Sequence, residues 1–200
     1  MKRMERANNR EPCWTGYAEG LHACLNSVEF TREGKEISVD EGFKVWAELT
    51  REIKKEGRTI YLIGNGASAS MASHYAADLA KNGQLHTEVF SDLSLITAIS
   101  NDMGYEHVFA EPLRRRAKEG DMLVAISSSG CSRNVLSAVA VAKELGVVVV
   151  GLSAMDSSNP LRTLAELSIY VSANTYGYAE TSHAAILHYW MDGVQSDQGV

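Results

Sequence analysis

The sequence predicts an α/β protein: a doubly wound parallel sheet with helices on both faces, preceded by N-terminal helices. Three observations support this prediction. Short apolar runs alternate with longer stretches of helical periodicity, which is the rhythm of βα units. The apolar runs are continuous, as in strands covered on both faces. Two of them lead directly into loops rich in glycine and serine, at residues 64–70 and 127–134.

Residues 1–56 are predicted to be an N-terminal helical segment, with two helices between about residues 15 and 55 that break near Gly34. Residues 57–195 are predicted to form one compact domain. Its expected strands cover 59–63, 87–90, 122–126, 147–152 and 168–171. Its expected helices cover 68–81, 93–101, 108–118, 134–145, 160–167 and 178–194. Because ligands of such sheets bind beyond the carboxyl ends of strands, the loops after Ile63 and Ile126 are the expected place of a site.

The composition narrows the function classes. The 200 residues carry a formal net charge of -6, which argues against binding to nucleic acid or to an anionic membrane. The three cysteines, Cys13, Cys24 and Cys131, form neither a metal-type pair nor an even disulfide framework, so we expect reduced thiols and a cytoplasmic location. The charged start is followed by no apolar segment of signal-peptide or membrane-span length, so neither secretion nor membrane spanning is expected.

Both glycine and serine loops are suited to bind an anion. In the first, a helix beginning at Ser68 would present free backbone N–H groups at its positive end, with Asn65 and Gly66 just before it. The second offers four hydroxyls, from Ser127, Ser128, Ser129 and Ser132. The same residue types also serve as ordinary caps and turns. Neither loop matches the P-loop or the three-glycine dinucleotide pattern, which disfavours nucleotide binding.

Titratable side chains gather in two helices. His74 and Asp78 are four residues apart in the helix after the first loop and therefore share a face. Glu180, His183 and His188 lie on or just before the last helix. These residue types supply general acids and bases and also zinc ligands. On an apolar helix a lone histidine is more often a core residue, and this is the expectation for His183.

These motifs resemble the SIS (sugar isomerase) family, and within it the phosphoheptose isomerases. The resemblance runs from about residue 59 to 193 and rests on the loop 64–70 with His74 and Asp78 behind it, on residues 95–105, and on residues 120–135. It implies an aldose–ketose isomerase that converts sedoheptulose 7-phosphate to a heptose 7-phosphate through an enediol or enediolate. It further implies that Ser68, Ser127, Ser129 and Ser132 hold the phosphate. Further substrate-binding candidates from the same motifs are Asn65, Gly66, Asp92, Asn101, Asp102 and Ser128.

The resemblance also implies roles for the helix residues. It gives Asp78 and His188 as the catalytic pair. Some members of the family hold zinc (Zn2+), and the matching ligands here are His74, Asp78, Glu180 and His188. Members assemble as homotetramers with active sites at subunit interfaces, so the same is expected here.

The chain departs from the family pattern at two places. Asp78 stands where the family has a glutamate, which shortens the reach of the carboxylate by one methylene. Residues 175–180 replace an arginine- and glutamine-containing segment, and Glu180 matches either the family glutamine, which we prefer, or the glutamate after it. On an ideal helix Glu180 and His188 are about 12 Å apart in rise, so one ion would contact both only if the helix starts after Glu180.

Two alternatives to this function are a non-catalytic SIS module that binds a sugar phosphate or a protein partner, and an isomerase for another phosphorylated ketose.

Overall fold

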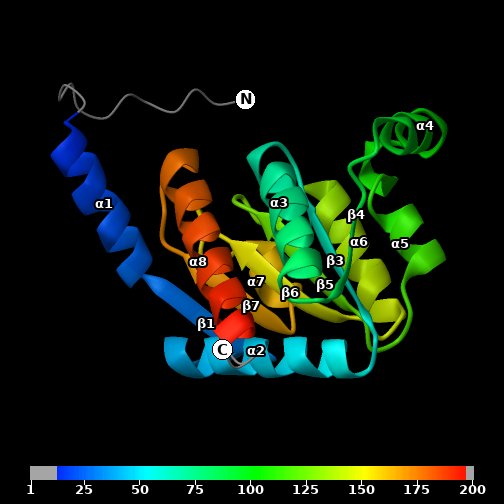
Figure 1. Ribbon diagram of the computed structural model, residues 1–200. Coiled ribbons are helices and arrows are strands. Elements are labelled where there is room, and N and C mark those ends of the chain that lie inside the picture. Colours follow the sequence, from blue (N-terminus) through cyan, green and yellow to red (C-terminus); the bar gives the residue numbers. More distant parts are fainter. Residues whose placement is uncertain (1–12, 197–200) are drawn as a thin grey trace.

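A seven-stranded sheet lies between layers of helices in the computed structural model, which describes residues 13–196 (Figure 1). The charged start at residues 1–6 lies outside the described residues. In chain order the elements are α1 (Trp14–Asn26), β1 (Val28–Arg32), β2 (Lys35–Ile37), α2 (Val39–Lys55), β3 (Thr59–Gly64), α3 (Ala67–Lys81), β4 (His86–Val89), α4 (Leu93–Met103), the 3-10 helix η1 (Tyr105–His107), α5 (Ala110–Arg116), β5 (Met122–Ser127), α6 (Arg133–Glu144), β6 (Val148–Ser153), α7 (Pro160–Leu164), β7 (Leu167–Val171) and α8 (Tyr176–Ser196).

The sheet is doubly wound, as predicted. Its strand order is β2-β1-β7-β6-β5-β3-β4, and the strands from β7 to β4 are all parallel. From β3 the chain first moves outward to β4 and then returns to β5 on the other side of β3. The direction of winding therefore reverses between β3 and β5. At such a reversal the two connections leave on opposite faces of the sheet and open a crevice at the carboxyl ends of the strands.

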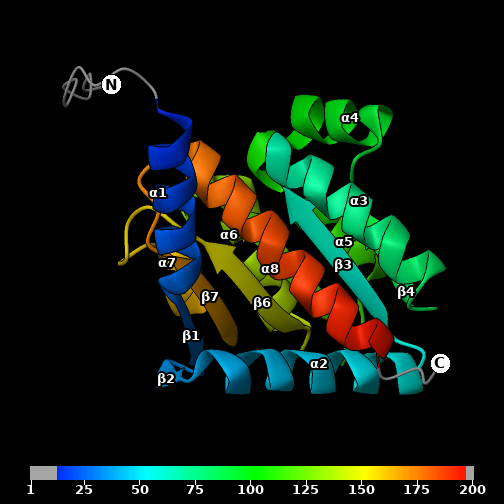
Figure 2. The same cartoon turned by 60° about the vertical axis from the view of Figure 1, so that its left-hand side comes forward.

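Each face of the sheet has its own hydrophobic core. Ile60 and Leu62 of β3 point to the face covered by α2, α3 and α8, where they join one buried cluster. Tyr61 and Ile63, the alternate residues, point to the face covered by α5 and α6 and join a second cluster. Helices α3 and α8 lie side by side on the first face in both views (Figures 1 and 2). Burial on both sides explains why these strands are continuously apolar.

The predicted strands agree with β3 to β7 within one residue at either end. The prediction for the N-terminal segment was wrong in part, because a β-hairpin, β1 and β2, separates its two helices. Glu33 and Gly34 both have positive φ, 49° and 77°, which is the geometry of a tight hairpin turn and not of a helix break. Phe30 is fully buried because β1 pairs with the distant strand β7.

Two predicted helices are shorter in the structure. The helix expected at 108–118 corresponds to α5 alone, which begins at Ala110 and ends at Arg116, with the separate 3-10 helix η1 before it. The helix expected at 160–167 ends at Leu164, because Leu167 already belongs to β7. Within residues 13–196, no helix has the length and apolar character that a membrane crossing needs.

A pair of buried tryptophans fixes α2 against the end of α8, where the two helices cross in Figure 2. Trp46 of α2 stacks on Trp190 of α8 with ring centroids 4.2 Å apart. The indole Nε1 of Trp190 donates a hydrogen bond of 2.9 Å to Oγ1 of Thr50, which is itself fully buried on α2. A polar hydrogen bond therefore sets the register of two apolar helix faces.

We expect Thr50→Val to lower the free energy of unfolding by about 1–3 kcal/mol, because it leaves the indole N–H of Trp190 buried without an acceptor. The matched control is Thr181→Val, the same change at an exposed position of α8, which should stay within about 0.5 kcal/mol of the wild type. Urea denaturation followed by circular dichroism gives both values. Equal free energies of unfolding for the two variants would show that the hydrogen bond does not stabilise the fold.

Candidate functional site

A small polar pocket lies in the crevice where β3 and β5 end. We call it the serine pocket; its volume is about 130 Å³. Its lining comes from the loop after β3 and the first turn of α3, from the end of β5 and the loop after it, and from the first turns of α8. The lining residues are Asn65, Ser68, Ile126, Ser127, Ser128, Ser129, Ser132, Tyr176 and Glu180. The structure thus brings together most of the phosphate-binding residues that the sequence predicted.

Two helices begin at this pocket. Ser68 lies in the first turn of α3, and Ser132 is the residue immediately before α6. The first N–H groups of a helix have no acceptor within the helix, and the helix dipole places partial positive charge there. The serine pocket therefore offers an anion backbone donors and positive potential without a lysine or arginine in its lining.

The hydroxyls of the pocket are only partly satisfied by one another. Ser127 Oγ donates to Ser132 Oγ at 3.2 Å. The Ser128 hydroxyl is buried, with 5% of the residue exposed, and its oxygen has no hydrogen-bond partner among the described residues. A buried hydroxyl without a partner costs free energy. A phosphate oxygen in the pocket would supply the missing partner.

The loop after β5, residues 127–134, which we call the serine loop, is held in place by its contact with the loop before α7. Gly130 has φ +62°, and a Cβ there would lie 1.9 Å from the side-chain oxygen of Asn159. Its carbonyl accepts from the N–H of Leu161 at 3.1 Å. Asn159 is itself fixed, because its amide donates to Ser153 and its oxygen caps α7. Only glycine fits this position, which is why the hydroxyls before and after it converge.

A paired amide closes the other side of the serine pocket. Asn65 and Asn134 exchange side-chain hydrogen bonds of 3.0 and 2.8 Å, and the hydroxyl of Tyr105 donates to the same oxygen of Asn65 at 3.0 Å. The same amides line an adjoining pocket of about 380 Å³, whose lining also includes Arg133 and Glu106. Sequence reasoning named Asn65 but not Asn134 or Tyr105. The position of Asn134, directly behind the serine loop, was the available signal.

The predicted acid–base residues form a second cluster, on the outer surface of α3 and α8. His74 Nε2 lies 3.5 Å from Asp78 Oδ2, and their side chains are 56% and 27% exposed. The rings of His74 and His188 are 5.9 Å apart between centroids. The structure thus brings His74, Asp78 and His188 to one solvent-facing patch, which we call the histidine patch.

Tyr75 sets the spacing of that patch. Its ring packs against His74 and His188, each at 5.0 Å between centroids, and its hydroxyl donates to the carbonyl of Ala184 on α8 at 2.7 Å. Burial, together with the nearby carboxylates of Asp78 and Asp192, raises the pKa of Tyr75 to about 12. The phenol therefore stays protonated and keeps its hydrogen bond to α8.

The four predicted zinc ligands are not brought together. Glu180 lines the serine pocket, whereas His188 belongs to the histidine patch. Helix α8 begins at Tyr176, so Glu180 lies inside it, and eight residues of helix separate the two side chains by about 12 Å of rise. Throughout residues 13–196 no group of three or more His, Cys, Asp or Glu side chains is placed to hold a metal ion.

The remaining candidates have mainly structural surroundings. His183 is fully buried, and its Nε2 donates to the carbonyl of Ser153 at 3.2 Å. Burial lowers the pKa of His183 to about 4, so it is a neutral core residue, as expected. Asp92 caps α4, where its bonds to Ser94 and Leu95 lower its pKa. Asn101 and Asp102 are exposed and bonded to each other. None of Asp92, Asn101 and Asp102 lines the serine pocket.

Comparison with known proteins decides the family. The model of the SIS domain matches residues 28–154, which include the serine loops and the strand reversal between them. The chain belongs to the SIS domain family. It is 35% identical to the phosphoheptose isomerase of Campylobacter concisus over 70% of this chain and 77% of that protein. It is 34% identical to that of Geobacter metallireducens over 88% and 96% of the two chains.

Solved structures agree with this SIS fold. The phosphoheptose isomerase of Neisseria gonorrhoeae superposes with a TM-score of 0.78 at 30% identity and covers 90% of this chain and 96% of its own. The enzyme of Francisella tularensis, at 23% identity, has a TM-score of 0.79 over 92% and 96% of the two chains. The second likeness concerns the fold alone.

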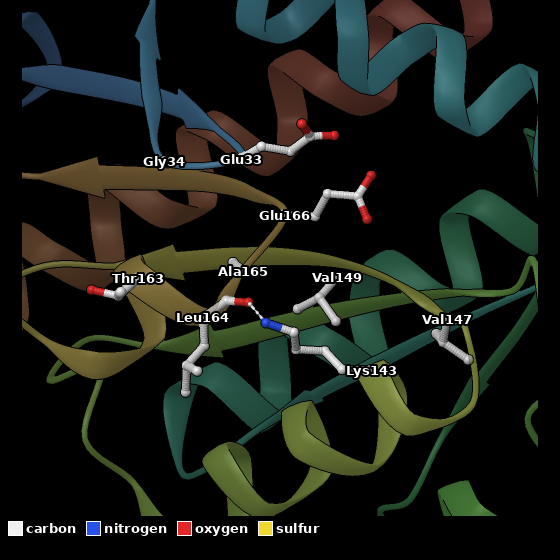
Figure 3. Close-up of a pocket in the computed structure, with 9 residues that line it drawn as sticks. All are labelled: Glu33, Gly34, Lys143, Val147, Val149, Thr163, Leu164, Ala165 and Glu166. Carbon is white, nitrogen blue, oxygen red and sulfur yellow. Dashed lines mark hydrogen bonds between the residues drawn. The ribbon is translucent and has the colours of Figure 1, made fainter.

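A further pocket of about 370 Å³ lies at the opposite edge of the SIS domain, where β6 and β7 begin. Figure 3 shows Glu33 and Glu166 at one side of it and the Lys143 amine bonded to the carbonyl of Leu164 at the other. No predicted site residue lines this pocket. The crevice between β3 and β5 is therefore the candidate site.

We expect Gly130→Ala to abolish phosphate binding by the SIS domain, since the added methyl group must displace Asn159 and with it the serine loop. The matched control is Gly34→Ala. Gly34 also has a positive φ, +77°, but a Cβ there meets nothing within 4 Å, so it introduces the backbone strain alone. Calorimetric titration with inorganic phosphate measures both. Wild-type affinity in the Gly130 variant would contradict this account of the loop.

Proposed function

We propose that this chain is a phosphoheptose isomerase, which interconverts sedoheptulose 7-phosphate and a heptose 7-phosphate. One observation of the structure carries the proposal. Five serines from two helix-opening loops converge on a single pocket, and the buried hydroxyl of one of them, Ser128, has no hydrogen-bond partner within residues 13–196. Relatives that bear this name also support it, since the Geobacter metallireducens protein matches 88% of this chain over 96% of its own length.

The phosphate is the part of the substrate that the serine pocket would bind. Hydroxyls and helix N–H groups at the serine pocket would bind its oxygens, and this binding is remote from the reacting carbons at the other end of the open-chain sugar. Such remote binding energy orients the reacting end and lowers the entropic part of the barrier.

The isomerisation itself requires one acid and one base. A proton leaves C1 or C2, an enediol or enediolate forms, and a proton returns to the other carbon. A second proton moves between the oxygen atoms on C1 and C2. We assign these transfers to Asp78 and His188. The carboxylate of Asp78 lies within ion-pair distance of His74, which holds it in place, and Tyr75 packs against the His188 ring. General acid–base groups of this kind contribute factors of about 10²–10⁴ to the rate.

Zinc is assigned no step in this mechanism. The family suggests the ion, but of its four predicted ligands only His74, Asp78 and His188 lie close together, with Glu180 turned to another pocket. A zinc ion at the histidine patch would require ligands beyond those that this chain brings together, and chelation in the assay below tests for one.

We further propose that the enzyme is a cytoplasmic homotetramer whose active sites lie between subunits. Two features support an interface. The histidine patch is exposed to solvent, and none of its residues lines the serine pocket of its own chain. Large apolar side chains are exposed on neighbouring helices: Trp14, Tyr176 and Tyr189. Such exposure marks interaction surfaces. A second subunit would bring another histidine patch to the pocket.

The decisive assay follows the aldose formed from sedoheptulose 7-phosphate by chelator-treated protein, with and without added zinc. We expect turnover, and we expect His188→Ala and Asp78→Asn each to reduce kcat by about 10²–10⁴-fold with little change in phosphate binding. His86→Ala, at an exposed histidine of β4, is the control and should be unaffected. Binding without turnover under every metal condition would instead indicate a non-catalytic sugar-phosphate module.

Shared active sites predict complementation between two inactive variants. Co-assembly of equal amounts of Ser129→Ala chains and His188→Ala chains should recover about a quarter of wild-type turnover. Each site then has about one chance in two of an intact serine pocket and about one in two of an intact His188, so about a quarter of the sites have both. Each variant alone stays inactive. Mass measurement by light scattering confirms the tetramer in the mixture. No recovery in a mixed tetramer would place the whole site within one chain.

A further inference from the structure

The buried histidine of α8 carries one hydrogen bond and one unused ring nitrogen. His183 is fully buried, and its Nε2 lies 3.2 Å from the carbonyl oxygen of Ser153. Because a carbonyl only accepts, Nε2 carries the proton of the neutral ring. Nδ1 has no hydrogen-bond partner within residues 13–196, which costs free energy that an apolar side chain would avoid. The bond to Ser153 is what a leucine at this position could not supply.

The acceptor of that bond is the last residue of β6, beside the start of the serine loop. Ser153 pairs with Ser127 in the parallel ladder between β6 and β5. The next residue, Ala154, donates its N–H to the carbonyl of Ser128 at 2.9 Å. The end of β6 therefore contacts the first two residues of the serine loop, and Ser127 and Ser128 both line the serine pocket.

The segment after β6 contacts the serine loop a second time. The Asn159 amide donates to Ser153 Oγ at 3.1 Å and to the carbonyl of Asp156 at 2.8 Å. Its side-chain oxygen lies against Gly130, whose carbonyl accepts from the N–H of Leu161. Residues 153–161, which we call the β6 support, thus hold the serine loop at two places, and a pocket residue, Ser129, lies between them.

We propose that His183 is a positioning residue for phosphate binding, because its hydrogen bond fixes the β6 support, and through it the serine loop, against α8. His183 does not line the serine pocket and would not touch the phosphate. It acts through the Ser153 carbonyl and the Ala154 N–H. Groups that bind a substrate must be held within about 0.5 Å of their productive positions, so a support of this kind affects affinity.

The expected effect is on binding and not on proton transfer. The part of α8 that carries His188 is held by other bonds. The Tyr75 hydroxyl donates to the carbonyl of Ala184, and Trp190 donates to Thr50. Loss of the His183 bond should therefore raise the KM for the phosphorylated sugar and leave kcat nearly unchanged.

The inference rests on the phosphate site of the proposed function, and calorimetric titration with inorganic phosphate tests it. His183→Leu removes the donor and should weaken phosphate binding at least about tenfold. His183→Gln places an amide N–H near the position of Nε2 and should bind phosphate within about threefold of the wild type. The titrations are made at a temperature where circular dichroism shows each variant folded. If His183→Leu does not fold, His183→Asn replaces it, since its shorter amide does not reach the Ser153 carbonyl.

Thr50→Val is the matched control. It also removes a buried hydrogen bond of α8, but near the end of the helix that lies away from the serine pocket. It should bind phosphate as tightly as the wild type, even where it lowers the free energy of unfolding as much as His183→Leu does.

Three results would overturn the positioning role and leave the isomerase proposal standing. They are wild-type affinity in a folded variant without the donor, an equal loss of affinity in Thr50→Val, and no recovery of affinity in His183→Gln. Absence of phosphate binding by the wild type would instead overturn the phosphate site itself, and this inference with it.

Discussion

The reversal of winding between β3 and β5 is the constraint on which the site depends. Two neighbouring parallel strands send their connections to opposite faces, so neither connection covers the crevice where both end. Into that crevice the chain places two short loops, and each opens a helix. Hydroxyls and free N–H groups converge there from opposite faces of the sheet. The suitability of the serine pocket for an anion therefore follows from topology and loop composition, with no lysine in its lining.

Helix α8 connects this crevice with the rest of the site. Its first turns supply Tyr176 and Glu180 to the serine pocket, and two turns later it presents His188 beside His74 of α3. The hydrogen bond from Tyr75 to the backbone of Ala184 and the Trp46–Trp190 stack hold α8 against α3 and α2. Within one chain, a rigid helix thus fixes the position of the histidine patch relative to the serine pocket.

The sequence predicted those features that local chemistry determines. The strands β3 and β5 were recognisable because burial on both faces makes them continuously apolar, and the serine loop because hydroxyls and Gly130 follow a strand directly. The hairpin β1–β2 was missed because its main stabilising partner, β7, lies about 140 residues away in the chain. A strand that short has no decisive local signal.

The surroundings of Glu180 were equally hard to predict. The family resemblance implied a zinc site of His74, Asp78, Glu180 and His188. The structure instead begins α8 before Glu180 and places that residue in the lining of the serine pocket. The pairing of Asn65 with Asn134 likewise depends on how two loops from different βα units meet. Contacts between distant loops are decided by tertiary structure, which residue spacing does not encode.

The hairpin also determines how the sheet ends. Without β1 and β2, the long and fully buried strand β7 would present its unpaired backbone groups at the edge. The edge is instead β2, three residues long, with the charged and exposed side chains of Lys35 and Glu36. Short charged edges resist the addition of a further strand from another molecule. Contacts between copies of this protein are thereby directed to its helices, and continuous growth of the sheet from chain to chain is discouraged at this edge.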